Sequence, residues 1–183
     1  MRSYHPLYDR GMSTWAAIER VDPPKSPDDE RNSLESWLDF HRATLLMKCS
    51  GLESEQLALR SCPPSSLSLL GLVRHMTEVE PWFHDFDGEP ASEWYSTDSD
   101  PDGAFDSVDP SRANEDLAAY HASVQRAHRA VEGRSLDDIS PESGDHGEAI
   151  SLRWIYQHMI EEYARHNGHA DLLRERIDGA TGD

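Results

Sequence analysis

The chain has 183 residues, and 35 Asp and Glu against 17 Lys and Arg leave a formal net charge of −18. That length suits one domain with a single hydrophobic core. A charge of this sign repels a phosphate backbone and an anionic lipid surface, so we expect the protein to bind neither nucleic acid nor membranes.

Residues 1–27 are rich in proline, tyrosine and tryptophan without a helical period, and we interpret them as an arm that packs on the outside of the domain. Residues 28–183 form the domain itself. Its first helix follows the acids at 28–30, which suit a helix N-terminus, and carries apolar residues at steps of three and four. Gly51 stops this pattern, so the first helix is predicted over 30–50.

The second helix is predicted over 67–83, with Pro81 near its end. The stretch 85–116 then holds eleven acids and one base, Arg112, among Gly, Pro and Ser. Such a composition is typical of a solvated connection. A connection of about 25 residues between the second and third helices can cross the length of a helical bundle.

The third helix is predicted to begin near Pro110, because proline suits a first helical turn, and to end at Gly133. Residues 134–149 are predicted to form a polar loop. Ser151 then caps a fourth helix, which continues to Ile177.

Four amphipathic helices with almost no strand pattern indicate an all-α fold, namely a four-helix bundle. The first connection is short enough for antiparallel neighbours, whereas the connection between the second and third helices is a long crossover. These lengths favour an up-down-down-up order of the helices.

The fourth helix carries two polar residues, Glu162 and His166, in the middle of its buried face. An ionised carboxylate on such a face is costly unless it is paired or coordinates a metal. Because residues four apart stack on a helix, these two side chains can point a carboxylate oxygen and a ring nitrogen at one ion. The apolar residues that define the face are Ile155, Met159, Ala170, Leu173 and Ile177.

A third ligand would have to come from another helix, and His75 is the candidate because it lies near the apolar stripe of the second helix. Three ligands leave coordination positions open, which is typical of catalytic rather than structural zinc. The spacing E-x-x-x-H has many chance matches, so a metal site and a plain Glu–His hydrogen bond both stay open. The other histidines on helices are interpreted as packing or rim residues: His41, His121, His128 and His158.

Two segments carry a resemblance to a known family. Residues 66–75 read SLSLLGLVRH, and residues 158–171 read HMIEEYARHNGHAD. Together with the four helices and the long crossover, they resemble the DinB-like metal-binding superfamily, and within it the subgroup of mini-circle-type proteins. The resemblance covers about residues 30–180 and implies the DinB-like bundle fold.

The resemblance implies a divalent ion held by His75, Glu162 and His166. The superfamily commonly uses three histidines, and here Glu162 stands where the first histidine of the fourth-helix pair is found. The same replacement occurs in the mycothiol-dependent maleylpyruvate isomerases, to which the chain is similar. The implied ion is zinc, with nickel, iron or manganese as alternatives. His169 would at most orient a ligand.

As to activity, the resemblance implies a transferase that uses a low-molecular-weight thiol of the mycothiol type and a small electrophilic substrate. A metal-dependent hydrolase and a non-catalytic metal-binding or stress-related bundle are the alternatives. Candidates for proton transfer are His158, Glu161, Tyr163 and His169, although a surface or packing role is favoured for each. Residues that could line the mouth of the bundle, or else fill the core, are Trp82, Trp94 and Trp154.

A cytoplasmic location is predicted from the cysteine content and the N-terminus. Cys49 and Cys62 are too few for a disulfide framework, and no apolar signal region precedes the domain. No run approaches the roughly 18 apolar residues of a membrane-spanning helix. The helix face with Trp37, Leu45 and Leu46 favours a homodimer, because its apolar surface exceeds what one core can bury.

Overall fold

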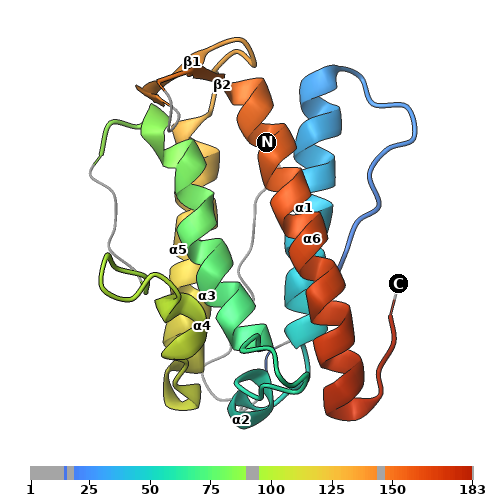
Figure 1. The fold of residues 1–183 in the computed structure, drawn as a ribbon. Helices are drawn as coiled ribbons and strands as arrows, with labels where there is room; N and C mark the ends of the chain where they lie inside the picture. The colour runs from blue at the N-terminus through green and yellow to red at the C-terminus, as the bar shows by residue number, and fades with distance from the viewer. Residues whose placement is uncertain (1–14, 16–18, 90–94, 144–146, 183) are drawn as a thin grey trace.

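The computed structural model describes residue 15 and residues 19–89, 95–143 and 147–182 (Figure 1). Most of the arm lies outside the described residues, but Trp15 is buried and its carbonyl accepts a hydrogen bond from the Gly51 amide at 2.8 Å. The elements in chain order are α1 (Glu30–Cys49), α2 (Ser54–Leu57), α3 (Leu69–Val79), the 3₁₀-helix η1 (Glu80–Phe86), α4 (Gly103–Asp106), the 3₁₀-helix η2 (Pro110–Arg112), α5 (Ala113–Ala130), β1 (Ile139–Ser143), β2 (Ala149–Ser151) and α6 (Leu152–Asp178).

The four long helices form a bundle with the predicted order. Helices α1 and α6 run from the end with the β-hairpin toward the end with α2, while α3 and α5 run the opposite way (Figure 1). Helix α1 packs mainly along α6, and α3 packs against both α5 and α6. The up-down-down-up order is therefore confirmed, since α3 ends near the β-hairpin and α5 begins at the opposite end of the bundle (Figure 1). No helix among the described residues is long and apolar enough to span a membrane.

Capping residues set the ends of α1 and α6. Asp29 accepts a hydrogen bond from the Asn32 amide at 2.8 Å, and Ser151 accepts one from the Trp154 amide at 3.2 Å. Gly179 follows α6 with a φ of 78°, a left-handed conformation that glycine adopts without strain. The predicted bounds of these two helices are confirmed to within about one residue.

Two predicted helices change form at prolines. Helix α3 ends at Val79 and continues as η1, in which Pro81 occupies the first turn and has no amide to donate. Similarly, Pro110 opens the 3₁₀ turn η2, and α5 begins only at Ala113. The second and third helices are therefore not continuous α-helices over their predicted lengths.

The polar loop predicted for 134–149 is wrong in part, because β1 and β2 pair there as an antiparallel hairpin, with Ile139 opposite Ser151. Both strands are short and β1 contains a proline, so no strand pattern is visible in the sequence. The Ser140 hydroxyl donates to Asp85 of η1 at 3.1 Å and fixes the hairpin to the end of the bundle.

The acidic crossover packs against α3 and α5 instead of being solvated throughout. Glu78 of α3 accepts a hydrogen bond from the Tyr95 amide at 2.7 Å. The Arg74 guanidinium donates to the Gly103 carbonyl at 2.9 Å and lies 4.1 Å from the Tyr95 ring centroid. The Tyr95 hydroxyl donates to Asp116 at 2.9 Å, and Asp116 is buried. The expectation of a solvated stretch is therefore wrong for this part of it.

The apolar face that favoured a homodimer is mostly used within the chain. Leu45 and Leu46 are 0% and 4% exposed, whereas Trp37 is 45% exposed. The homodimer stays a prediction, now supported by Trp37 alone. Cys49 is buried and Cys62 is half-buried, and both are free thiols, as expected of packing or loop residues.

Candidate metal centre

The three predicted ligands meet where α3 passes α6. His75 lies on α3, and Glu162 and His166 lie one turn apart on α6. Each residue offers one ring nitrogen or carboxylate oxygen, and these three atoms all lie within 4.8 Å of one another. We call His75, Glu162 and His166 the three-ligand cluster. Its donor atoms can face a common point between the two helices.

The cluster is largely shielded from solvent. Glu162 Oε2 lies 3.5 Å from His166 Nε2, and the two side chains are only 13% and 11% exposed. The His75 and His166 rings meet edge to face with centroids 4.7 Å apart. The Phe105 ring of α4 lies 5.1 Å from the His75 ring. An apolar ring at this position limits the access of water to the cluster.

Burial keeps both imidazoles neutral at pH 7. Desolvation lowers the pKa of His75, although Glu162 and Glu78 oppose the shift. Desolvation, with repulsion from His75 and His169, lowers the pKa of His166 to about 4. A neutral imidazole has the free lone pair that a metal ligand needs.

Two neighbours on α6 orient the pair. His169 Nδ1 lies 3.4 Å from His166 Nδ1. The other ring nitrogen of His166, Nε2, faces Glu162 Oε2 at 3.5 Å. Arg165 donates to Glu162 Oε1 at 2.9 Å and also to Glu161. His169 therefore has the position of a residue that orients a ligand, and Arg165 balances the charge of Glu162.

A comparison with protein families places the chain. The family model of the mycothiol S-transferases matches residues 33–179, a range that includes the whole three-ligand cluster. The chain belongs to the mycothiol S-transferase family. This family is part of the DinB-like superfamily, so the predicted superfamily is confirmed, and the match supports a transferase-type function that uses mycothiol. The mini-circle-type subgroup stays a prediction. No curated protein and no solved structure matches the chain.

In this member of the mycothiol S-transferase family, an aromatic group formed by Trp154 and His158 of α6 and Trp82 of η1 lies beside the cluster. The ring centroids of Trp82 and Trp154 are 5.5 Å apart, and His158 stacks on Trp154 with centroids 4.8 Å apart. Trp154 is 45% exposed, so the group forms part of the surface next to Glu162. Trp94, the third tryptophan expected at the mouth, lies outside the described residues.

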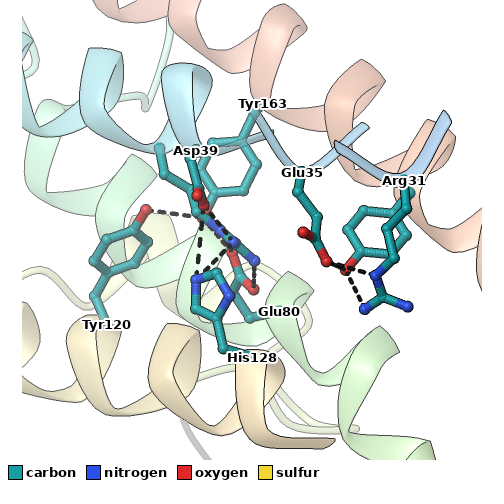
Figure 2. Close-up of polar contacts among 9 residues, drawn as sticks. Arg31, Glu35, Asp39, Glu80, Tyr120, His128 and Tyr163 are labelled. Carbon is teal, nitrogen blue, oxygen red and sulfur yellow. Dashed lines mark hydrogen bonds and ion pairs between the residues drawn. The ribbon is translucent and has the colours of Figure 1, made fainter. Parts of the chain in front are cut away.

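A buried polar network that the sequence did not predict lies at the centre of the bundle (Figure 2). Glu80 is fully buried and accepts two hydrogen bonds from Arg42, at 2.9 and 2.6 Å. The Tyr163 hydroxyl donates to Glu80 at 2.6 Å, and the Tyr120 hydroxyl lies 2.8 Å from that of Tyr163. Arg42 also lies 3.2 Å from Nε2 of His128, which is 46% exposed and borders this network at the rim of the bundle.

The Tyr163 hydroxyl therefore belongs to this buried polar network and not to the metal centre. Burial and the charge of Glu80 raise its pKa well above the usual range of tyrosine, and the buried side chain has the packing role that was favoured over proton transfer. One sequence signal for this network was available. Arg42 falls on the apolar stripe of α1, four residues after Leu38 and three before Leu45.

Proposed function

We propose that the protein is a metal-dependent thiol S-transferase of the mycothiol type, with a divalent ion bound by His75, Glu162 and His166. The observation that carries this proposal is the convergence of three donor atoms from two helices within 4.8 Å. The family match supports the thiol as a substrate.

The donor set suits zinc. Two imidazole nitrogens and one carboxylate oxygen form a ligand set known from catalytic zinc sites, and it leaves a fourth position for substrate. The His166 ring is neutral at pH 7 because its pKa is lowered to about 4, and the net charge of −18 attracts cations. Arg165 bonds Glu162 through Oε1, so Oε2, which lies 3.5 Å from His166 Nε2, can bind an ion beside it.

A divalent ion with an open position lowers the pKa of a coordinating thiol, so that a thiolate nucleophile exists at neutral pH. The chain itself has to fix the position of that ion between α3 and α6 and to bind the second substrate. The exposed Trp154 and its neighbour Trp82 offer flat apolar contact for an electrophile. Cys49 is not a nucleophile in this proposal, since burial raises its pKa to about 12.

Metal analysis tests the three-ligand cluster directly. After reconstitution with zinc and desalting, the wild type should retain about one tightly bound equivalent, and His166→Ala should retain less than about a tenth of that. His128→Ala is the matched control, because His128 is exposed on α5 and lies outside the cluster. A wild type that retains only a small fraction of an equivalent would remove the metal from the proposal.

A thiol-consumption assay tests the transferase. Zinc-loaded protein is mixed with mycothiol and a panel of electrophiles, and mass spectrometry identifies a thiol adduct as the expected product. Bound metal without turnover of any electrophile would favour the non-catalytic bundle. Product that forms by hydrolysis without thiol would favour the hydrolase.

A further inference from the structure

A second set of donor atoms lies beside the three-ligand cluster on α6. His158, Glu161 and Glu162 each offer one ligand atom, and these atoms lie within 4.8 Å of one another. Glu161 and Glu162 follow His158 by three and four positions, so both carboxylates lie on the same side of α6 as His158. Among the described residues, the two sets have Glu162 in common.

The two carboxylate oxygens of Glu162 have different partners. Its Oε2 lies 3.5 Å from His166 Nε2, on the side of the three-ligand cluster. Its Oε1 accepts a hydrogen bond from Arg165 Nη1 at 2.9 Å, and the other terminal nitrogen of Arg165 donates to Glu161. The guanidinium therefore connects two carboxylates and supplies the positive charge that a bound cation would supply. The 54% exposed Arg165 side chain can turn away when a cation takes its place.

His158 is held in position by aromatic side chains. Its ring stacks on Trp154 with an interplanar angle of 18°, and it meets Trp82 edge to face with centroids 5.0 Å apart. A ring that packing has already oriented loses little conformational freedom when it binds a ligand. The second set thus contains one preorganised nitrogen ligand next to two carboxylates.

We propose that His158, Glu161 and Glu162 bind a second divalent cation, so that Glu162 bridges two ions in one centre. This inference rests on the proposed function, because it requires the first ion in the three-ligand cluster. One nitrogen and two carboxylate oxygens form a harder donor set than the first, which suits manganese, iron or zinc. The second ion binds more weakly than the first, since Glu161 is 49% exposed and Arg165 has to be displaced.

Titration of the metal-free, full-length protein with Mn²⁺ tests this centre. Calorimetry should show about two equivalents, the second weaker, and electron paramagnetic resonance should show coupling between two nearby ions. His158→Ala and Glu161→Gln should each weaken the second ion by about tenfold or more and leave the first unchanged. Arg165→Gln should strengthen binding of the second ion, and Glu175→Gln, an exposed control on the same helix, should change neither ion.

The outcomes separate this inference from the proposed function. One equivalent in the wild type that is lost in His166→Ala overturns the two-ion centre and leaves the proposed function intact. No bound Mn²⁺ or Zn²⁺ in the wild type overturns both. Two equivalents that persist at full affinity in both His158→Ala and Glu161→Gln also overturn the inference. Because Glu161 is half-exposed, Glu161→Gln separates the loss of a ligand from a folding defect in His158→Ala.

Discussion

His75 of α3 and His166 of α6 meet edge to face, with ring centroids 4.7 Å apart, across the interface of two helices that are distant in sequence. Burial lowers the pKa of both rings, so both imidazoles are neutral at pH 7. An ion bound by both rings would connect α3 to α6. Metal binding should therefore change the stability of the whole bundle as well as its activity.

Zinc should raise the melting temperature of the wild type. A ligand at about 100 times its dissociation constant stabilises the folded state by about 2.7 kcal/mol, which corresponds to about 5–10 °C for a chain of this size. His75→Ala and His166→Ala should abolish this shift, and His128→Ala should keep it. Thermal unfolding followed by circular dichroism measures the shift. An undiminished increase in His166→Ala contradicts the assignment of the ligand.

Glu162→His should keep an ion, whereas Glu162→Ala should lose it. The histidine variant replaces one donor by another and restores the three-histidine set of the superfamily, but alanine removes the donor. We expect zinc affinity within about tenfold of the wild type for the first variant and about 100-fold lower for the second. Competition with a chromophoric chelator measures both. Equal affinity of the alanine variant and the wild type would exclude Glu162 as a ligand.

The free energy of unfolding should fall as the pH falls below 6.5. Burial lowers the pKa of the affected histidines in the folded state, so below pH 6.5 the unfolded chain binds more protons than the folded chain. Each extra proton that the unfolded chain binds lowers the free energy of unfolding by about 1.4 kcal/mol per pH unit. For His166 this decrease ends near pH 4, because the folded ring also binds the proton there. The histidines concerned are His41, His75, His84, His121, His128 and His166.

Urea unfolding of the metal-free protein at pH values from 7.5 to 4.5 measures this dependence. A free energy of unfolding that stays constant between pH 7 and pH 5 would contradict it. Bound zinc should steepen the loss, because protons compete with the ion for the ring nitrogens of His75 and His166.

Glu80→Ala should destabilise the fold by about 3–5 kcal/mol, because it leaves the charge of Arg42 buried without its partner. Tyr163→Phe removes one hydrogen bond to the carboxylate and should cost about 1.5–3 kcal/mol. Combining Arg42→Met with Glu80→Leu should cost less than Glu80→Ala, since no unpaired charge remains. Urea unfolding measures all three, and zinc affinity should stay unchanged. A double variant less stable than Glu80→Ala contradicts this account.

Gly103→Ala should destabilise the crossover, because a Cβ atom there would lie 2.2 Å from the carbonyl oxygen of Tyr95. Relief of this overlap should cost about 1–3 kcal/mol. Gly168→Ala on α6 is the matched control, since its Cβ would meet no atom within 4 Å. Alanine favours the helix there and should stabilise it by about 0.5–1 kcal/mol. Equal effects of the two substitutions in urea unfolding would contradict the close contact at Gly103.

Local patterns in the sequence were sufficient to predict where the long helices of the bundle lie. Caps such as Asp29 and Ser151 and the apolar period set the ends of α1 and α6, because these signals depend only on residues within a few positions of one another. The length of the crossover indicated the order of the helices. Glu162 and His166 could be paired from their spacing, since residues four apart always share a helix face.

Only the tertiary structure decided which buried polar groups on different helices meet. Helical periodicity shows that Arg42 and His75 face inward, but the rotation and offset of packed helices determine that Arg42 reaches Glu80 and that His75 reaches His166. The hairpin of β1 and β2 likewise depends on pairing between strands too short to show a pattern. These contacts join residues that are distant in the chain. Local sequence patterns therefore cannot predict them, because they depend on how the helices and strands pack.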